Sequence, residues 1–330
     1  NIDLQLIQES KANVTINNVT AQRPLYYIFN NGVDNGFIII SAEDNAIPIL
    51  GHSASGTINL NNSPPAFVKW LEEYKKELIY IIENDIQSTS EIKEKWQKLS
   101  NNGTLGDSKA LSVLPLLNTT WDQSPYYNNQ CPVNSNNDQA ITGCVATAMA
   151  QIMKYWEFPS QGILGHTYTS SFTGSTLSAN FGQTTYQWSS MPNVLTGSSS
   201  SNAVSAVAEL MYHCGVSVEM NYGTSLSGGS SASTTGPNVP SAEHALETFF
   251  GYDSSLHMVD EQNYTPSNWI QLLKTELDSG RPMQYRGSSN GGGHSFVCDG
   301  YDNLNKFYFH WGWGGSNNGF FHIGSLNTSN

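Results

Sequence analysis

The stretch FHWGWGG, residues 309–315, constrains the fold more than any other part of the chain, because it places two tryptophans and three glycines within seven residues. Tryptophan is large and mostly buried in folded proteins, and glycine permits tight turns and close approach of other groups. One interpretation is a plain aromatic core with glycines at its turns. The repetition W-G-W-G-G, headed by His310, favours the other interpretation, which is the wall of a functional site.

The chain of 330 residues is expected to form two domains, each with its own hydrophobic core. A stretch rich in Gly, Asn and Ser, SNNGTLGDSKA, is typical of a linker near residues 100–110. The basic residues change there as well, because nine of the 14 Lys and Arg lie in residues 1–109 and five follow. We therefore predict one domain over residues 1–108 and a second over residues 109–330.

The first predicted domain combines short strands with two helices. Strands separated by turns are predicted between residues 25 and 62, in LYYIFN, FIIISA and IPILGHSASGTINL. A long helix is predicted in SPPAFVKWLEEYKKELIYIIENDI, where apolar residues recur every three or four positions. These residues are Phe67, Trp70, Leu71, Tyr74, Leu78 and Ile81. A second helix, SEIKEKWQKL, follows a capping-box pattern from Ser88 to Glu91.

The second predicted domain places helices before strands. Residues Cys144 to Trp156 contain neither Gly nor Pro, and Pro159 follows the end of this predicted helix. Three further helices are predicted in SNAVSAVAELMYHCGV, SAEHALETFF and SNWIQLLKTELDSG. Beyond residue 280 the pattern changes to strands and turns, in PMQYRG, HSFVCDGYD, KFYFHWGWG and GFFHIGSL. This order predicts an α+β domain with segregated layers.

Charge and hydropathy exclude several classes of function. The formal net charge is -13 and no basic run exists, so we expect no nucleic-acid partner. The apolar runs are far shorter than the roughly 20 residues that span a bilayer, and we expect no membrane span. The N-terminus lacks the layout of a signal peptide, while abundant Asn, Ser, Thr and Gly with few lysines are typical of an exported protein.

The cysteines and most of the histidines show no metal-binding pattern. Four cysteines, Cys131, Cys144, Cys214 and Cys298, are scattered without a CxxC pair, and a disulfide that involves Cys131 stays open. Six histidines lack a paired spacing such as H-E-x-x-H, namely His52, His166, His213, His244, His257 and His322. No phosphate loop or dinucleotide fingerprint is found, so we expect neither a metal nor a cofactor.

Cys144 is the first candidate for chemistry. A thiol is a useful nucleophile only as the thiolate, and a helix N-terminus stabilises that anion through its free N–H groups and its dipole. Cys144 begins a predicted helix, and Gly143 before it leaves room for other groups. A lone helical cysteine is nevertheless more often a small core residue, so position alone does not define an enzyme.

His294 supplies the partner that a cysteine nucleophile needs. Three glycines precede it in GGGHSFVCDGYD, and a substrate backbone could therefore approach its ring. A histidine after glycines can also be a simple turn residue. Taken together, a cysteine followed about 150 residues later by a histidine has the chain order of papain-like peptidases. Trp311 would then shield the imidazole from water, and Asp299 and Asp302 could order the loop after His294.

Three blocks in this order resemble the streptopain family of secreted bacterial cysteine peptidases. They are TGCVATAMAQIMKYW, GGHSFVCDGYD and WGWGGSNNGFF, and the resemblance extends to LMYHCGVSVEMNYG. The N-terminal stretch YYIFNNGVDNGFIIISAEDNAIPILGHSASG is similar to the inhibitory propeptide of that family. The resemblance covers almost the whole chain and implies a papain-like peptidase domain after a smaller α+β pro-domain of antiparallel strands and helices.

The resemblance also implies roles for individual residues. Cys144 would be the nucleophile and His294 the base that activates it. The backbone N–H of Cys144 and the side chain of Gln139 would bind the oxyanion. Trp311 and Trp313 would support the site, and Ser227 and Gly293 would line the substrate cleft. The family usually has Asn before W-G-W-G-G, and this chain has His310 there. One hypothesis is that His310 orients the His294 imidazole. The other is that Trp311 and the backbone orient it.

The implied function is a secreted cysteine endopeptidase, made as a latent zymogen and activated by a cut near GDSKALSV. Its expected partners are protein or peptide substrates and its own pro-domain as an intramolecular inhibitor, and we expect a monomer. Two other readings remain: a binding protein on the same fold with a decayed site, and a papain-fold acyltransferase that uses an amine in place of water. The sequence does not predict the cleavage preference or the natural substrate.

Overall fold

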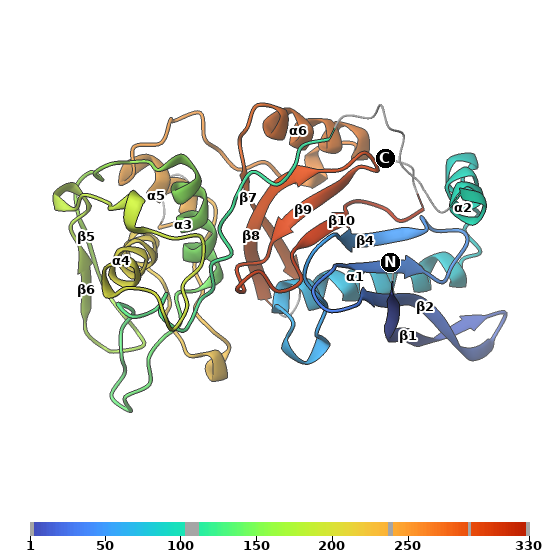
Figure 1. Ribbon diagram of the computed structural model, residues 1–330, viewed down its shortest axis with the longest axis horizontal. Helices are drawn as coiled ribbons and strands as arrows, with labels where there is room; N and C mark the ends of the chain where they lie inside the picture. The colour runs from blue at the N-terminus through green and yellow to red at the C-terminus, as the bar shows by residue number, and fades with distance from the viewer. Residues whose placement is uncertain (1–2, 103–111, 237–239, 290–291, 328–330) are drawn as a thin grey trace.

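The computed structural model describes residues 3–102, 112–236, 240–289 and 292–327. Its largest feature is one antiparallel sheet of eight strands in the order β1-β2-β3-β4-β10-β9-β8-β7 (Figure 1). The strands are β1 (Leu4–Ile16), β2 (Val19–Asn31), β3 (Phe37–Ser41), β4 (Ile49–Ser53), β7 (Met283–Ser289), β8 (Gly292–Tyr301), β9 (Lys306–His310) and β10 (Gly319–His322). Four strands come from each predicted domain, and the sheet therefore continues from the N-terminal part into the C-terminal part.

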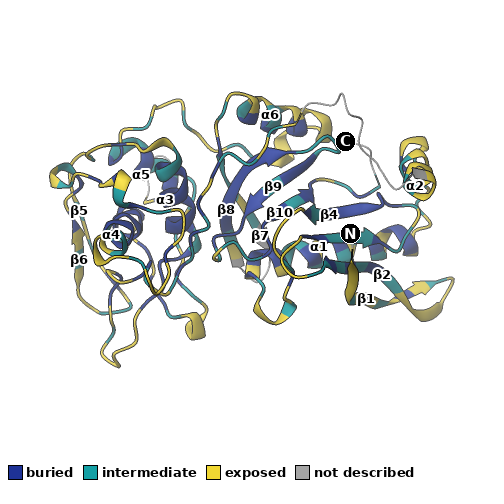
Figure 2. Ribbon diagram, viewed as in Figure 1, coloured by how far each residue is buried: buried dark blue, intermediate teal, exposed yellow. Residues whose placement is uncertain are grey.

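The first two strands form a long hairpin that the sequence analysis did not predict. Its turn consists of Asn17 and Asn18, both with positive φ (49° and 63°), as in the turns that match the twist of a two-residue hairpin. Most residues of β1 are exposed, and Figure 2 shows the exposed end of the hairpin in yellow. Because little of β1 is buried, its sequence lacks the clear apolar alternation that identifies a strand.

Two helices complete the N-terminal part. Helix α1 (Pro65–Glu83) begins at a proline as predicted and buries the expected apolar stripe, with Trp70 only partly buried. Helix α2 (Ser90–Asn102) also forms, but the prediction that Ser88 caps it is wrong. The N–H of Ile92 donates to Oγ1 of Thr89 at 3.3 Å, so the cap that accepts a free N–H of the first turn is Thr89.

The remaining helices lie in the C-terminal part, as predicted. Helices α3 (Cys144–Trp156), α4 (Ser201–Ser217) and α5 (Ala242–Thr248) gather at one end of the molecule beside an unpredicted hairpin, β5 (His166–Thr169) and β6 (Thr176–Ala179) (Figure 1). Helix α6 (Pro266–Asp278) packs on β8. Short 3-10 helices occur at η1 (Leu60–Asn62), η2 (Phe181–Gln183), η3 (Trp188–Ser190), η4 (Ser225–Ser227) and η5 (Glu261–Asn263).

Strand β8 separates two layers of the structure. On one face Phe296 contacts Trp70 of α1, with 6.3 Å between ring centroids. On the other face Val297 belongs to a small buried cluster with Ala148 and Ile152 of α3. Successive strand residues face opposite sides of a sheet, which accounts for this division. The N-terminal helix and the cysteine-bearing helix therefore lie on opposite faces of β8.

The segment that follows the predicted linker is bonded to the same strand. Val113 and Tyr301 exchange two backbone hydrogen bonds of 2.9 Å, and the N–H of Leu116 donates to the carbonyl of Asp299 at 3.1 Å. Residues 113–117 thus belong to the C-terminal part of the molecule.

The described residues contain neither a disulfide nor a helix that could span a membrane. All four cysteines are free thiols, so Cys131 forms no disulfide. No helix in the described ranges is both long and apolar enough to cross a membrane.

Candidate active site

Cys144 is the first residue of α3, as predicted, and its thiol is partly buried. Gly143 before it has a φ of 87°, which favours glycine. A Cβ atom at position 143 would lie 3.0 Å from both Sδ of Met220 and Cβ of Ser230, so this position has no room for a side chain. The close approach fixes the loop of residues 223–230 beside the start of α3.

Strand β8 brings the residues around His294 to this helix. The backbone N–H of Ser295 donates to Sγ of Cys144 at 3.5 Å, a contact across 151 positions of sequence. His294 precedes Ser295 in the strand and is itself partly buried. The structure therefore brings the two predicted reactive residues into one region, at the junction of α3 and β8.

The electrostatic environment favours uncharged forms of both groups. Burial raises the pKa of the Cys144 thiol, and this outweighs the backbone N–H groups of Ser295, Val145 and Cys144, which favour the thiolate. Burial lowers the pKa of His294, and the positive charge of Lys69 lowers it further. Lys69 belongs to α1, so the N-terminal part contributes directly to the charge state of the imidazole.

Trp311 lies in a buried aromatic cluster between β8 and α1. Its ring centroid is 4.7 Å from that of Phe296 and 6.0 Å from that of Phe67. The indole N–H donates to the carbonyl of Asn317 at 2.8 Å, and the backbone N–H donates to Oδ1 of Asn318 at 3.1 Å. By strand alternation, Trp311 is on the same side of β8 as His294.

His310 directs both ring nitrogens to residues other than His294. Because Oδ1 of Asn318 accepts the N–H of Trp311, its Nδ2 is the donor to Nδ1 of His310 at 3.1 Å. Nε2 of His310 then donates to Oδ2 of Asp299 at 3.1 Å, and both side chains are almost completely buried. His310 therefore supports the Trp311 loop rather than orienting the imidazole of His294.

The other predicted site residues differ in exposure and in the contacts that hold them. Gln139 donates from Nε2 to the carbonyl of Asn128 at 2.8 Å, so this side chain is held by its own loop. Ser227 is exposed in η4, where its hydroxyl accepts from the N–H of Thr224. Gly293 is exposed in β8, and Trp313 is partly buried in the turn after Trp311.

Several residues at this site were not predicted from the sequence. Ser295 acts through its backbone N–H, which no side-chain pattern reveals. Ser230 links the loop of residues 223–230 to the approach to α3, because its hydroxyl donates to the carbonyl of Ile141 at 2.7 Å and accepts from the N–H of Gly223 at 3.0 Å. Of these residues, Asn318 could most easily have been predicted from the sequence. It lies in GSNNGFF, and asparagine and glycine commonly mark a turn.

A latent papain-like cysteine peptidase is expected to have a cysteine at a helix N-terminus, a histidine on an adjacent strand and an N-terminal domain joined to the enzyme, and the described residues show all three. Comparison with known sequences agrees: the Peptidase C10 family matches residues 121–321, and the family described as Spi protease inhibitor matches residues 3–78. The chain belongs to the Peptidase C10 family. It is a cysteine endopeptidase with an inhibitor-type pro-domain.

Individual relatives share much of the chain. Streptopain of Streptococcus pyogenes is 32% identical over 324 residues, which cover 92% of this chain and 75% of the relative. The thiol protease/hemagglutinin PrtT of Porphyromonas gingivalis is 30% identical over 316 residues, or 93% of this chain. This chain spans only 34% of the length of PrtT.

Two solved structures of Prevotella intermedia proteins are similar to this one. A fragment of prointerpain A, in a mutant form, gives a TM-score of 0.78 at 32% identity and covers 98% of this chain and 93% of its own. Active wild-type interpain A gives a TM-score of 0.59 at 37% identity and covers 67% of this chain and 91% of its own.

Proposed function

We propose that Cys144 and His294 are the nucleophile and the general base of this peptidase, and that residues 1–108 keep it latent. The observation that carries the proposal is the contact between the Ser295 N–H and Sγ of Cys144, because it joins the helix of the cysteine to the strand of the histidine. Prior placement of two reactive groups is the main requirement of nucleophilic catalysis.

The chemistry follows from these two groups. His294 accepts the thiol proton, and the Cys144 sulfur attacks the peptide carbonyl carbon to give a tetrahedral oxyanion. The backbone N–H of Cys144 stabilises that oxygen, with Gln139 as a further donor once its side chain is released from Asn128. His294 then gives its proton to the leaving amine and afterwards takes one from the water that hydrolyses the acyl-enzyme. Peptide or protein substrates would cross the site beside Ser227, Gly293 and Trp313.

Latency is supported by the contacts between the N-terminal part and the peptidase strands. Strand β4 pairs with β10 through His52 with Phe320 and Gly51 with Phe321. Nε2 of His52 lies 2.7 Å from Oδ2 of Asp302. These contacts continue the peptidase sheet into the pro-domain, and α1 adds the aromatic packing against Trp311. The pro-domain is thereby an intramolecular partner of the peptidase.

We propose an activation cut upstream of Val113, and the hydrogen bonds of residues 113–117 to β8 support this position. Most of the candidate stretch GDSKALSV, residues 106–113, lies outside the described residues. The active interpain A structure covers only 67% of this chain, which is consistent with an enzyme that has lost a segment about as long as residues 1–108. We therefore keep the boundary between residues 108 and 109 as the proposed one. Export from the cell and a monomeric state are part of the same proposal.

Alkylation of Cys144 tests the catalytic pair. Iodoacetamide near neutral pH is expected to modify Cys144 slowly in the full-length chain, where burial raises the pKa of the thiol, and fast in the processed enzyme. The His294→Ala variant, after an added protease has cut it, should no longer show the fast alkylation of Cys144. Cys214 is a matched internal control, since it is fully buried and should stay unmodified in both forms. Equal, slow alkylation of Cys144 before and after processing would contradict the proposal.

A further inference from the structure

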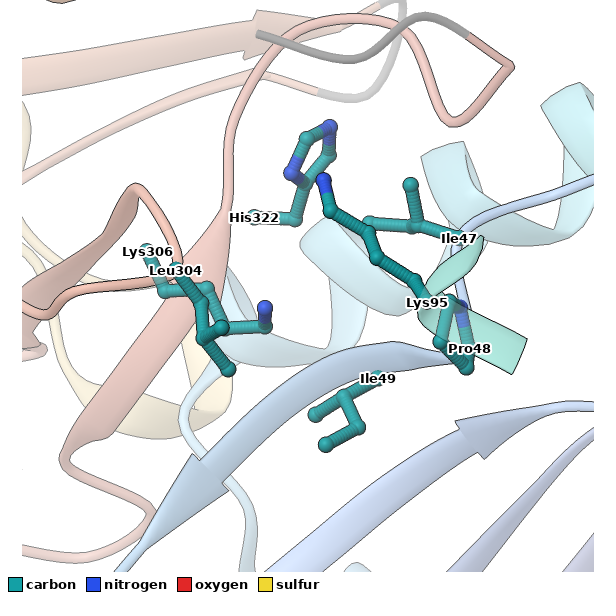
Figure 3. Close-up of a pocket in the computed structure, with 7 residues that line it drawn as sticks. All are labelled: Ile47, Pro48, Ile49, Lys95, Leu304, Lys306 and His322. Atoms are coloured by element: carbon teal, nitrogen blue, oxygen red, sulfur yellow. The ribbon is translucent and has the colours of Figure 1, made fainter. Parts of the chain in front are cut away.

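A small pocket, whose lining does not include Cys144, lies between the pro-domain and the peptidase strands (Figure 3). It is lined by Ile47, Pro48, Ile49, Lys95, Leu304, Lys306 and His322. The first four residues come from the N-terminal part, and the last three come from the peptidase. No step of the catalytic mechanism uses this pocket.

Lys306 is the most unusual residue in the pocket. It is only 4% exposed, although lysine is almost never fully buried without a partner. Among the described residues Lys306 forms no ion pair, although Asp302, which is paired with His52, lies near enough to affect its pKa. Burial, the largest cause, and the charge of Lys95 lower the pKa of Lys306 to about 8, while the charge of Asp302 opposes the change.

Two more basic groups point into the same space. Nζ of Lys95 pairs with Glu91 at 2.9 Å, and Figure 3 shows its end close to the ring of His322. Nε2 of His322 donates to the carbonyl of Ser325 at 3.1 Å, so Nδ1 is the nitrogen left to face other groups. Burial, the largest cause, and the charges of Lys306 and Lys95 lower the pKa of His322 to about 3. The pocket thus places the ammonium groups of Lys95 and Lys306 beside a neutral His322, and the Lys306 ammonium forms no ion pair with a described residue.

We propose that this pocket binds a small monovalent inorganic anion, such as chloride, between the ammonium groups of Lys95 and Lys306. The space accommodates about one water-sized species, which fits a halide ion. Apolar side chains of Ile47, Ile49 and Leu304 line part of the space, and their low polarity strengthens the attraction. One cation comes from each part of the molecule, so the anion bridges the pro-domain and the peptidase.

This location gives the anion a regulatory consequence, which rests on the proposed latency. A ligand that binds only when both parts are associated stabilises the associated form. Separation of the pro-domain removes Lys95 from the pocket and abolishes the site. The bound anion therefore delays activation.

Thermal unfolding of the full-length Cys144→Ala chain tests binding without self-cleavage. The midpoint is expected to rise by about 2 °C in sodium chloride relative to sodium gluconate at equal ionic strength, and to saturate. Lys306→Met should abolish the chloride-dependent difference, and Lys95→Met should do so if the first variant does not fold. Lys76→Met removes an exposed lysine of α1 and should keep the difference.

Direct detection and activation kinetics complete the test. Bromide soaked into crystals of the Cys144→Ala chain should appear between Lys95 and Lys306. Wild-type processing should be about threefold slower in chloride than in gluconate. Equal midpoints in the two salts, or a difference that persists in the Lys306→Met and Lys95→Met variants, would overturn the site. Anion binding without any effect on processing would overturn the regulatory consequence while leaving the proposed peptidase function intact.

Discussion

At the scale of single residues, His310 is held in place by both of its ring nitrogens. Nε2 donates to Asp299, and Nδ1 accepts from Asn318. Asp299 in turn accepts the N–H of Leu117 at 2.7 Å. His310 therefore ties together the Trp311 loop, β8 and the first segment of the peptidase.

We expect His310→Ala to reduce stability more than catalysis. Breaking a buried pair leaves the Asp299 carboxylate poorly compensated, which costs about 3 kcal/mol of unfolding free energy. The kcat/KM of the folded, processed enzyme should change by less than about tenfold. Urea unfolding and peptide hydrolysis measure the two effects. His257→Ala, at an exposed position, is the control. Loss of activity as complete as in His294→Ala, without lower stability, would instead assign His310 to catalysis.

Lys69 provides a second prediction at this scale. Its charge lowers the pKa of His294 in the latent form, after the larger effect of burial. Lys69→Gln should therefore raise the pKa of His294, measured by NMR titration of the full-length Cys144→Ala chain. Lys76→Gln, an exposed lysine paired with Glu73, should leave that pKa unchanged. An unchanged His294 pKa in Lys69→Gln would show that α1 acts on the imidazole through burial alone.

At the scale of elements, the pairing of β4 with β10 joins the two parts, and its geometry depends on small residues. A Cβ atom at Gly51 would lie 2.6 Å from Cδ1 of Phe321, and one at Gly319 would lie 2.8 Å from the carbonyl oxygen of His52. The two strands approach so closely that neither glycine has room for a side chain. This pairing of β4 with β10, the seam between the two parts, is therefore tight, and a larger side chain at Gly51 or Gly319 would disturb it.

Gly51→Ala should weaken this seam. The added methyl group displaces Phe321 or separates the strands, at a cost of about 1–3 kcal/mol. We expect a lower midpoint of thermal unfolding for the full-length chain and faster self-processing under reducing conditions. Ser55→Ala, at an exposed position just beyond β4, should behave as wild type. Slower processing of Gly51→Ala would contradict the assignment of this seam to latency.

The ion pair of Asp302 adds a pH-dependent contribution to the same seam. Burial tends to raise the pKa of Asp302, but the hydrogen bond to His52 and the charges of Lys306 and His52 outweigh it, so the pKa lies below its usual value. A carboxyl whose pKa is lowered in the folded state stabilises the fold at pH values above its unfolded pKa of 3.8. This stability is lost as the pH falls through the pKa of the folded state.

Asp302→Asn should therefore destabilise the chain at pH 7 by about 1 kcal/mol. The difference from wild type should shrink as the pH falls below 3.8. Urea unfolding of the Cys144→Ala background across this pH range measures the effect. Asp253→Asn, an exposed carboxyl near the surface, is a control for general charge effects. A difference that grows as the pH falls would contradict the sign of the argument.

At the scale of the whole molecule, the sequence predicted elements better than contacts. Helices α1 and α3 were predicted because buried residues with regular spacing, or a run free of Gly and Pro, mark a helix locally. The hairpin β1–β2 was missed because its exposed residues carry no such pattern. The contacts of His310 could not be predicted, since they depend on the register in which Val297 lies opposite His310. The seam between β4 and β10 likewise joins segments about 270 positions apart.

The central claim is that this chain is a latent cysteine peptidase that Cys144 activates by a cut upstream of Val113. The most direct measurement is incubation of the purified chain under reducing conditions, with casein hydrolysis followed and the N-terminus of the stable product sequenced. We predict a product that begins between residues 103 and 113, casein hydrolysis that appears only with it, and an intact Cys144→Ala chain. Full-rate casein hydrolysis by the uncut chain would contradict the account.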